Sequence, residues 1–176
     1  EQDSVLKYFQ PYYNYDSSVE KKVLKQLYHD FSVGIEGTPS GTLHVIAMRL
    51  HELYLNGIMS TPEYNRLVPD TTHMIRIVNG KEALSANAGK VYSTMAAYEA
   101  ILHHPSLVPY RSILQRCNLT DYVLPNLIYD KQRSDTEKSD LLSSIPLASG
   151  MVMSGQKIID RGEIVNDYTY RVLNSF

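Results

Sequence analysis

The sequence predicts an α+β domain that is predominantly helical and carries one or two small antiparallel strand pairs. Three observations lead to this fold class. Apolar residues recur at helical spacing over residues 17–31, 38–57 and 89–105. A β-branched run ending in Asn79-Gly80 predicts a hairpin near residues 73–86. A further strand motif is predicted at residues 148–165, around turn-forming glycines.

The most regular helical pattern begins at residue 17. Ser17 and Glu20 have the spacing of a capping box, and an apolar stripe follows from Val19 to Phe31. Thr38-Pro39 predicts the start of the next helix, with threonine as N-cap and proline in the first turn. Gly57 is placed to end that helix.

Shorter helices are predicted on both sides of the hairpin. Thr61-Pro62-Glu63 begins about two helical turns before the hairpin. Another helix follows Gly89 and ends at Pro105. Its predicted buried stripe is Val91, Met95, Tyr98, Ile101 and Leu102. Two short helical pieces at 112–116 and 119–124, and a polar helix at about 134–145, complete the pattern.

The 176 residues are expected to form a single domain, as one body or as two lobes. In the two-lobe division, residues 1–104 form a helical lobe that includes the hairpin near 73–86. Residues 105–176 then combine helices with the strand motif 148–165. The first residues already lie in a helical pattern without an initiating methionine, so we expect a piece of a longer protein.

Composition argues against several functional classes. A net charge of −2, with basic residues scattered among acidic ones, predicts no nucleic-acid partner. The single cysteine, Cys117, excludes an internal disulfide and a cysteine metal cluster. The 14 tyrosines, with no tryptophan, suit half-buried and interface positions because each ring has a polar tip.

The sequence shows no constellation that would carry catalysis. His29-Asp30 is the dipeptide of HD hydrolases, but that metal site needs an upstream histidine, and no histidine precedes His29. His44, Met48 and His51 lie in a row on one helix, yet nothing marks a further ligand. We therefore expect this chain to be no enzyme and to hold no metal or cofactor.

Two patterns supply candidate ligand-binding residues. Pro11-x-x-x-Tyr15-Asp16 recurs as Pro125-x-x-x-Tyr129-Asp130, and each copy precedes a charged helix that its aspartate is suited to cap. A second group, at 160–163, forms either a surface ion cluster or a ligand clamp. The candidate ligand-binding residues are Tyr15, Asp16, Tyr129, Asp130, Asp160, Arg161 and Glu163.

Three segments, in the same order, resemble one known family. Gly150–Val165, which reads GMVMSGQKIIDRGEIV, resembles the closing motif of the extracellular domain of seven-transmembrane HD hydrolases. Pro125–Asp130 with its charged helix is similar to the family segment that precedes this motif, and Val5–Asp16 is similar to the family's opening. The tyrosine-rich segments resemble those of a Bacteroidetes member of the family.

This resemblance implies a domain on the extracytoplasmic (periplasmic) face of the bacterial inner membrane, within a multi-pass membrane protein. The cytoplasmic HD domain of related proteins hydrolyses cyclic di-AMP with two metal ions, and none of those ligands lies in this chain. The family's external domain is regarded as a sensor, so the resemblance implies binding of an unknown envelope ligand or protein and regulation through the protein's own transmembrane bundle.

Two other interpretations stay open at this point. In the first, the domain is a structural module that forms a homodimer or docks a partner without a small-molecule ligand. The remaining alternative, an independent hydrolase, requires turnover that depends on added metal and on His29.

Overall fold

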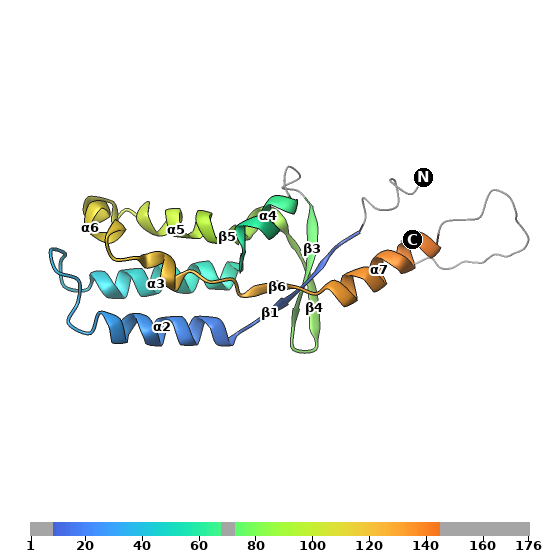
Figure 1. The fold of residues 1–176 in the computed structure, drawn as a ribbon, viewed down its shortest axis with the longest axis horizontal. Helices are drawn as coiled ribbons and strands as arrows, with labels where there is room; N and C mark the ends of the chain where they lie inside the picture. Colours follow the sequence, from blue (N-terminus) through green and yellow to red (C-terminus); the bar gives the residue numbers. More distant parts are fainter. Residues whose placement is uncertain (1–8, 68–72, 145–176) are drawn as a thin grey trace, which may run out of the picture. The chain divides into compact units, whose positions relative to one another are not determined.

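The computed structural model describes residues 9–67 and 73–144 and confirms the α+β class (Figure 1). The chain divides into two compact units. Gln10–Ser134 form one unit, and Glu1–Phe9 with Asp135–Phe176 form the other. The fold below is that of Gln10–Ser134, from which one helix continues to Ser143, and the strand motif predicted at 148–165 lies outside the described residues. The division into lobes at residue 104 stays a prediction.

Helices of very different length make up most of the described chain. The α-helices are α2 (Ser18–Asp30), α3 (Thr42–Asn56), α4 (Thr61–Leu67), α5 (Thr94–Leu102), α6 (Arg111–Gln115) and α7 (Lys131–Ser143). Single 3₁₀ turns are η1 (Ala88–Lys90), η2 (Val108–Tyr110) and η3 (Leu119–Tyr122). In Figure 1, α3 lies between α2 and α5, and all three run side by side.

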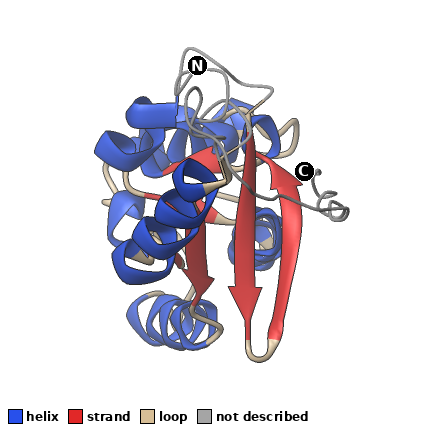
Figure 2. Ribbon diagram, turned by 90° about the vertical axis from the view of Figure 1, so that its right-hand side faces the viewer, coloured by secondary structure: helices blue, strands red, loops and turns tan. Residues whose placement is uncertain are grey.

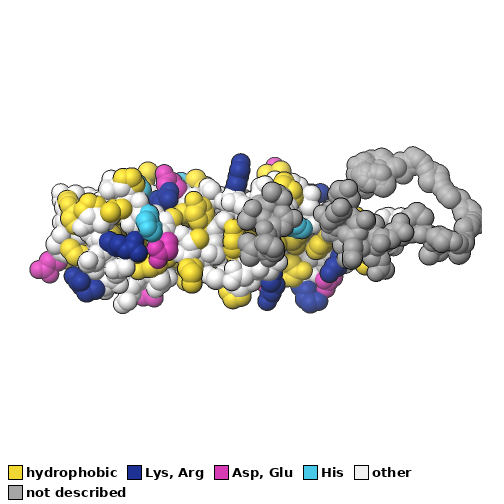
Figure 3. Space-filling model, turned by 90° about the horizontal axis from the view of Figure 1, so that it is seen from above, with side chains coloured by type: hydrophobic (Ala, Val, Ile, Leu, Met, Phe, Trp, Pro, Cys, Tyr) yellow, Lys and Arg dark blue, Asp and Glu magenta, His cyan; other side chains and the backbone are white. Residues whose placement is uncertain are grey.

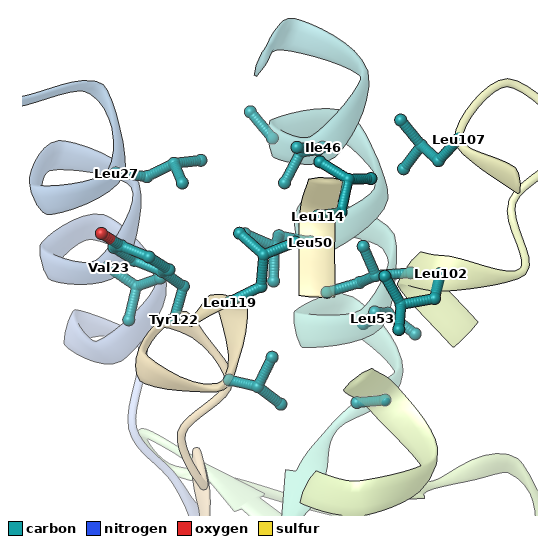
Figure 4. Close-up of a cluster of buried hydrophobic side chains, with 14 of the residues drawn as sticks. Val23, Leu27, Ile46, Leu50, Leu53, Leu102, Leu107, Leu114, Leu119 and Tyr122 are labelled. Carbon is teal, nitrogen blue, oxygen red and sulfur yellow. The ribbon is translucent and has the colours of Figure 1, made fainter. Parts of the chain in front are cut away.

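The main hydrophobic core lies between these helices (Figure 4). Leu27 of α2, Leu50 of α3 and Leu114 of α6 are fully buried and point toward one another. The apolar stripes predicted for α2 and α3 supply a large part of it, because residues three and four apart share one helix face, and much of the rest comes from α5 and the segments that follow it. The buried members of this core also include Val23, Ile46, Leu53, Ile101, Leu102, Leu107, Leu119 and Tyr122.

Two helix boundaries differ from the predictions. The helix α3 begins at Thr42 and not at Thr38-Pro39, because the Thr38 hydroxyl donates to Ile35 O at 2.6 Å and closes a turn. The helix α5 begins at Thr94, so Val91 is buried ahead of it and Met95 faces outward, 66% exposed. The predicted buried position of Met95 is therefore wrong. Gly57 does end α3, as predicted.

A four-stranded mixed sheet packs beside the helices (Figure 2). Its order is β4 (Glu82–Asn87), β3 (Met74–Asn79), β1 (Tyr12–Tyr15) and β6 (Leu127–Tyr129). The β3–β4 and β1–β6 pairs are antiparallel, whereas β1 and β3 run parallel. A second, two-stranded parallel sheet joins β2 (Ile58–Met59) to β5 (Tyr92–Ser93).

The hairpin predicted near residues 73–86 is confirmed as β3–β4, with a shift in its turn. The two turn residues are Gly80 and Lys81, because Asn79 still pairs with Glu82 across the ladder. Gly80 has a φ of +67°, which a glycine adopts without a steric penalty.

One face of the four-stranded sheet buries a second, smaller core. Tyr13, Ile75 and Leu127 are at most 2% exposed, and they pack against Met59, Ala88 and Val91. Partly buried tyrosines surround this cluster: Tyr15, Tyr64 and Tyr129. Several tyrosines therefore take half-buried positions, some around the sheet and others against the main core, where the rings pack.

Candidate functional site

The two copies of the repeated Pro-x-x-x-Tyr-Asp pattern form the adjacent strands β1 and β6. Their pairing is nearly two-fold symmetric, because the Asp16 N–H donates to Asn126 O and the Asp130 N–H donates to Tyr12 O, both at 2.8 Å. Between these bonds, Asn14 lies opposite Ile128. The repeat seen in the sequence is thus a structural repeat of strand followed by helix. We take the β1–β6 pair and its flanking side chains as the candidate functional site.

Asp130 caps α7. Its Oδ1 accepts the Arg133 N–H at 2.9 Å, and its Oδ2 accepts from Asn14 Nδ2 at 3.2 Å and lies 3.8 Å from Arg133 Nε. The backbone N–H of Arg133 is the main reason that the pKa of this carboxyl is lower than its ordinary value. The capping role predicted for Asp130 is confirmed.

Asp16 caps α2, as the repeated pattern predicted, and Ser17 does not. The Asp16 Oδ1 accepts the Ser18 hydroxyl at 2.6 Å and the Ser18 N–H at 3.0 Å. The hydroxyl is the main reason that the pKa of Asp16 is lowered. Ser17 makes no side-chain capping bond, so the predicted capping box with Glu20 is wrong.

Tyr15 and Tyr129 lie on the buried side of the strand pair. The Tyr15 hydroxyl donates to Tyr54 O at 3.3 Å, and burial raises the pKa of this phenol, with the charge of Glu20 adding to the effect. The Tyr129 ring packs on Tyr13, with ring centroids 5.5 Å apart. Asp16 and Asp130 lie at opposite ends of the pair, so the four predicted residues share two strands without meeting at one point.

Tyr13 anchors this face to α4. Its hydroxyl donates to Glu63 Oε1 at 3.4 Å, and Glu63 also pairs with Arg66. Burial, followed by the charge of Glu63, raises the pKa of Tyr13. The phenol is therefore held in its neutral, hydrogen-bond-donating form.

Asn126 is a functional-site residue that the sequence prediction missed. It is fully buried, and its Oδ1 accepts the Ile58 N–H at 2.7 Å while its Nδ2 donates to Tyr54 O at 3.0 Å. Its backbone also bonds to Ile58 and Asp16. One asparagine thus joins β6 to α3, β2 and β1. The available signal was a lone amide inside the apolar run around Leu127.

Tyr54 completes the same network from α3. Its hydroxyl donates to Tyr122 O at 2.6 Å and accepts the Leu124 N–H at 3.0 Å. Burial raises the pKa of Tyr54 to about 12. This phenol fixes the segment that leads from the helices into β6.

The opposite side of the strand pair carries positive charge, which the sequence did not single out. The guanidinium carbons of Arg76 and Arg133 each lie 5.8 Å from the centre of the Tyr12 ring, within the range of a cation–π interaction. Asn14 and Asp130 are bonded to each other beside Arg133. Side chains from β1, β3 and the start of α7 therefore converge here.

The remaining sequence candidates are not part of this site. Asp160, Arg161 and Glu163 lie outside the described residues. Asp30 of the His29-Asp30 dipeptide accepts from Gln26 Nε2 at 2.7 Å and from the Tyr122 hydroxyl, while His29 is exposed. Within residues 9–67 and 73–144, no three His, Cys, Asp or Glu side chains are grouped as a metal site would require.

The surface seen in Figure 3 mixes small hydrophobic groups with charges of both signs. On the part of this face that the structure describes, basic side chains do not gather into a stripe of the kind that binds nucleic acid.

Comparison with known proteins gives one family. The chain matches the family described as 7TM-HD extracellular (7TMR-HDED) over residues 1–176. No curated protein and no solved structure shows significant similarity to it. Among the described residues, no helix has the length and apolarity needed to cross a bilayer. The match over the whole length shows that the chain belongs to the 7TM-HD extracellular family and is an extracytoplasmic domain of a membrane-bound HD protein.

Proposed function

We propose that this chain is a sensor domain that binds an envelope ligand or protein and regulates a cytoplasmic cyclic-dinucleotide phosphodiesterase of the HD class. The hydrolytic site belongs to a part of the parent protein outside this chain. Family membership supports the external position of the domain, and the structure offers a way in which binding outside would be passed along the chain.

The observation that carries the proposal is the hydrogen bonding of β1 to β6. The unit Gln10–Ser134 is joined covalently to the rest of the chain through the residues before β1 and those after β6. These two connections are bonded to each other, because the Asp130 N–H donates to Tyr12 O and the Tyr12 N–H donates to Ser134 Oγ, both at 2.8 Å. A shift of one strand against the other therefore changes both connections at once.

The charged side of the strand pair is the surface best suited to receive a ligand. Guanidinium groups bind carboxylate, phosphate and sulfate groups through paired hydrogen bonds, so Arg76 and Arg133 favour an anionic envelope ligand. Such a ligand would compete with Asp130 for Arg133 and would disturb the first turn of α7. It regulates the protein only if it binds two conformations with different affinities.

Of the predicted ligand-binding residues, Asp130 borders this surface. Tyr15 and Tyr129 face the other side of the sheet, so their environment would change when the strand pair moves. Asp16 lies at the far end of the pair. Their roles in ligand binding stay predictions.

A reversible lock between the strands tests the proposal in the full-length parent protein. Asn14 and Ile128 are opposed and exposed, and the Cα separation of such pairs, about 5.5 Å, suits a disulfide. We expect Asn14→Cys with Ile128→Cys, in a Cys117→Ser background, to abolish the response of cyclic di-AMP hydrolysis to a soluble envelope extract when oxidised. Reduction should restore the response, and each single-cysteine variant should respond normally in both states.

Two results would contradict the proposal. If deletion of the domain leaves regulated hydrolysis unchanged, the domain is not a sensor. If the locked protein responds like the reduced one, the strand pair does not transmit the signal. For the ligand surface, Arg76→Gln should abolish the thermal shift that the envelope extract causes in the chain, whereas Arg116→Gln, an exposed arginine in the helical part, should not.

One prediction concerns the cap of α7. Asp130→Ala is expected to lower the free energy of unfolding by about 1 kcal/mol at neutral pH, whereas Asp130→Asn keeps a capping oxygen and costs little. The folded-state pKa of Asp130 is lowered, so its contribution is present above the unfolded value and is lost as the pH falls through the folded pKa. Urea unfolding at neutral and acidic pH should show this loss, with faster hydrogen exchange at the Arg133 N–H in the alanine variant. Equal stability of the two variants would exclude the cap.

A further inference from the structure

The strand β4 lies at an edge of the described four-stranded sheet. Among the strands that the structure describes, β4 pairs only with β3 (Figure 2). On the side of β3 that faces β1, the Arg76 N–H donates to Pro11 O. On the side that faces β4, His73 O accepts the Ala88 N–H. Backbone bonds therefore alternate along β3, and in β4 the N–H and C=O groups of Ala83, Ser85 and Asn87 face away from β3.

This edge lacks the features that normally prevent strand addition. It is six residues long, contains no proline and carries one charged residue, Glu82, at its end. Lys81 in the adjoining turn balances that charge. Leu84, near the middle of the strand, is 65% exposed. Open edges of this kind readily accept another strand, and proteins usually protect them with lysine, proline or a bulge.

We propose that β4 pairs antiparallel with β4 of a second copy of this chain, about a two-fold axis at Leu84. In that arrangement Ala83 of each copy lies opposite Ser85 of the other, so the outward-facing backbone groups of both residues are satisfied. Leu84 meets its own counterpart at a position without direct backbone bonds, where side chains lie closest. The most exposed apolar residue of the strand becomes the centre of the contact.

The charges of the edge suit a second copy. Glu82 lies opposite Ala86 of the other strand and Lys81 opposite Asn87, so no charged residue faces its own counterpart. The charges of Lys81 and Glu82 cancel within each copy, and two identical edges can therefore approach without net repulsion. An isologous contact requires a patch that is complementary to itself, and this edge meets that condition.

The pairing would join two four-stranded sheets into one continuous sheet. The β1–β6 pair of each copy would then belong to the same sheet as that of the other. This interface goes beyond the proposed sensing function and holds whether or not the domain binds a ligand.

Sedimentation of the purified chain over a range of concentrations tests the proposal. Wild type should associate, and Leu84→Lys should weaken the association constant by about tenfold or more, because two like charges would face each other. Leu55→Lys is the matched control, since Leu55 on α3 is 62% exposed, close to the value for Leu84. It should associate like wild type. A mixture of Leu84→Lys and Leu84→Glu should associate again as the mixed pair.

A cross-link gives an independent measurement. In a Cys117→Ser background, Leu84→Cys should form a covalent dimer under mild oxidation much faster than Leu55→Cys. The proposal is overturned if the wild-type chain stays monomeric up to about 1 mM, if the two lysine variants associate equally, or if the two cysteine variants cross-link at the same rate. A chain that is monomeric alone and binds a foreign strand would equally exclude the second copy as the occupant.

Discussion

Asn126→Ala is expected to lower the free energy of unfolding by about 3 kcal/mol, because it leaves buried polar groups without partners. The substitution removes the acceptor of the Ile58 N–H and the donor to Tyr54 O in a fully buried place. An unsatisfied buried group costs about 1–3 kcal/mol, and the lost volume adds to that cost. Since domains are stable by about 5–15 kcal/mol, a large part of the folding free energy would be lost.

Asn126→Asp separates lost hydrogen bonds from lost volume, because the two side chains have nearly the same shape. At neutral pH a carboxylate would turn an oxygen toward Tyr54 O, so we expect a loss at least as large as that of alanine. Protonation restores a donor, and the loss should shrink as the pH is lowered. Asn56→Ala is the control, since exposed Asn56 makes one bond of 3.1 Å to Lys90 O. Urea unfolding measures both variants. Equal losses of unfolding free energy for Asn126→Ala and Asn56→Ala would contradict the stabilising role of the buried Asn126 hydrogen bonds.

The parts of this fold that could be predicted are those determined by neighbours in the sequence. The stripe from Val19 to Phe31 predicted α2 because residues three and four apart share one helix face. The hairpin followed from Gly80 and the β-branched run before it. The aspartates of the repeated pattern were expected to cap helices, and both do so.

Contacts between distant segments were not predictable in the same way. The strand β1 pairs in parallel with β3, which lies about sixty residues later in the sequence. From sequence alone, the segment Tyr12–Tyr15 after a proline predicted only the end of a helix and no strand. The strand β6 is three residues long, too short for alternation to be recognised. The hydrogen bonds of Asn126 reach Tyr54, Ile58 and Asp16, which are distant in sequence, so the lone amide in an apolar run could be noticed but its partners could not be predicted.

Local alternatives also competed at the element ends. Asp16 and Ser17 are both good N-cap residues, and the sequence does not decide between them. In the structure Ser17 has helical backbone angles, φ −70° and ψ −10°, and the carboxylate of Asp16 reaches Ser18. Sequence spacing identified the helix start to within a residue, and of the two predicted capping residues Asp16 is confirmed and Ser17 is wrong.

Gly57→Ala is expected to destabilise the protein by about 3 kcal/mol, through backbone strain and a steric clash together. Gly57 ends α3 with φ +100° and ψ +133°, a conformation that residues with a Cβ rarely adopt. A Cβ atom there would lie 2.6 Å from Leu127 Cδ1 of β6. Because Leu127 is 2% exposed, it has little space to move away.

The matched control is Gly34→Ala, which has a positive φ of +84° and nothing within 4 Å of the added methyl group. It should show the backbone cost alone, about 1–2 kcal/mol. Urea unfolding of both variants measures the difference, which reports the contact between α3 and β6. Equal losses would show that the clash is relieved.

A double-mutant cycle locates the clash. Leu127→Ala alone should cost about 2–5 kcal/mol, as expected for a buried leucine. Combined with Gly57→Ala, it removes the atom that the new methyl group meets, so the total loss should be smaller than the sum of the two. The close approach of Gly57 and Leu127 places the end of α3 directly against β6, the strand whose pairing with β1 links both chain connections. If the losses of the two single variants simply add in the double variant, the end of α3 and β6 are not energetically coupled at this contact.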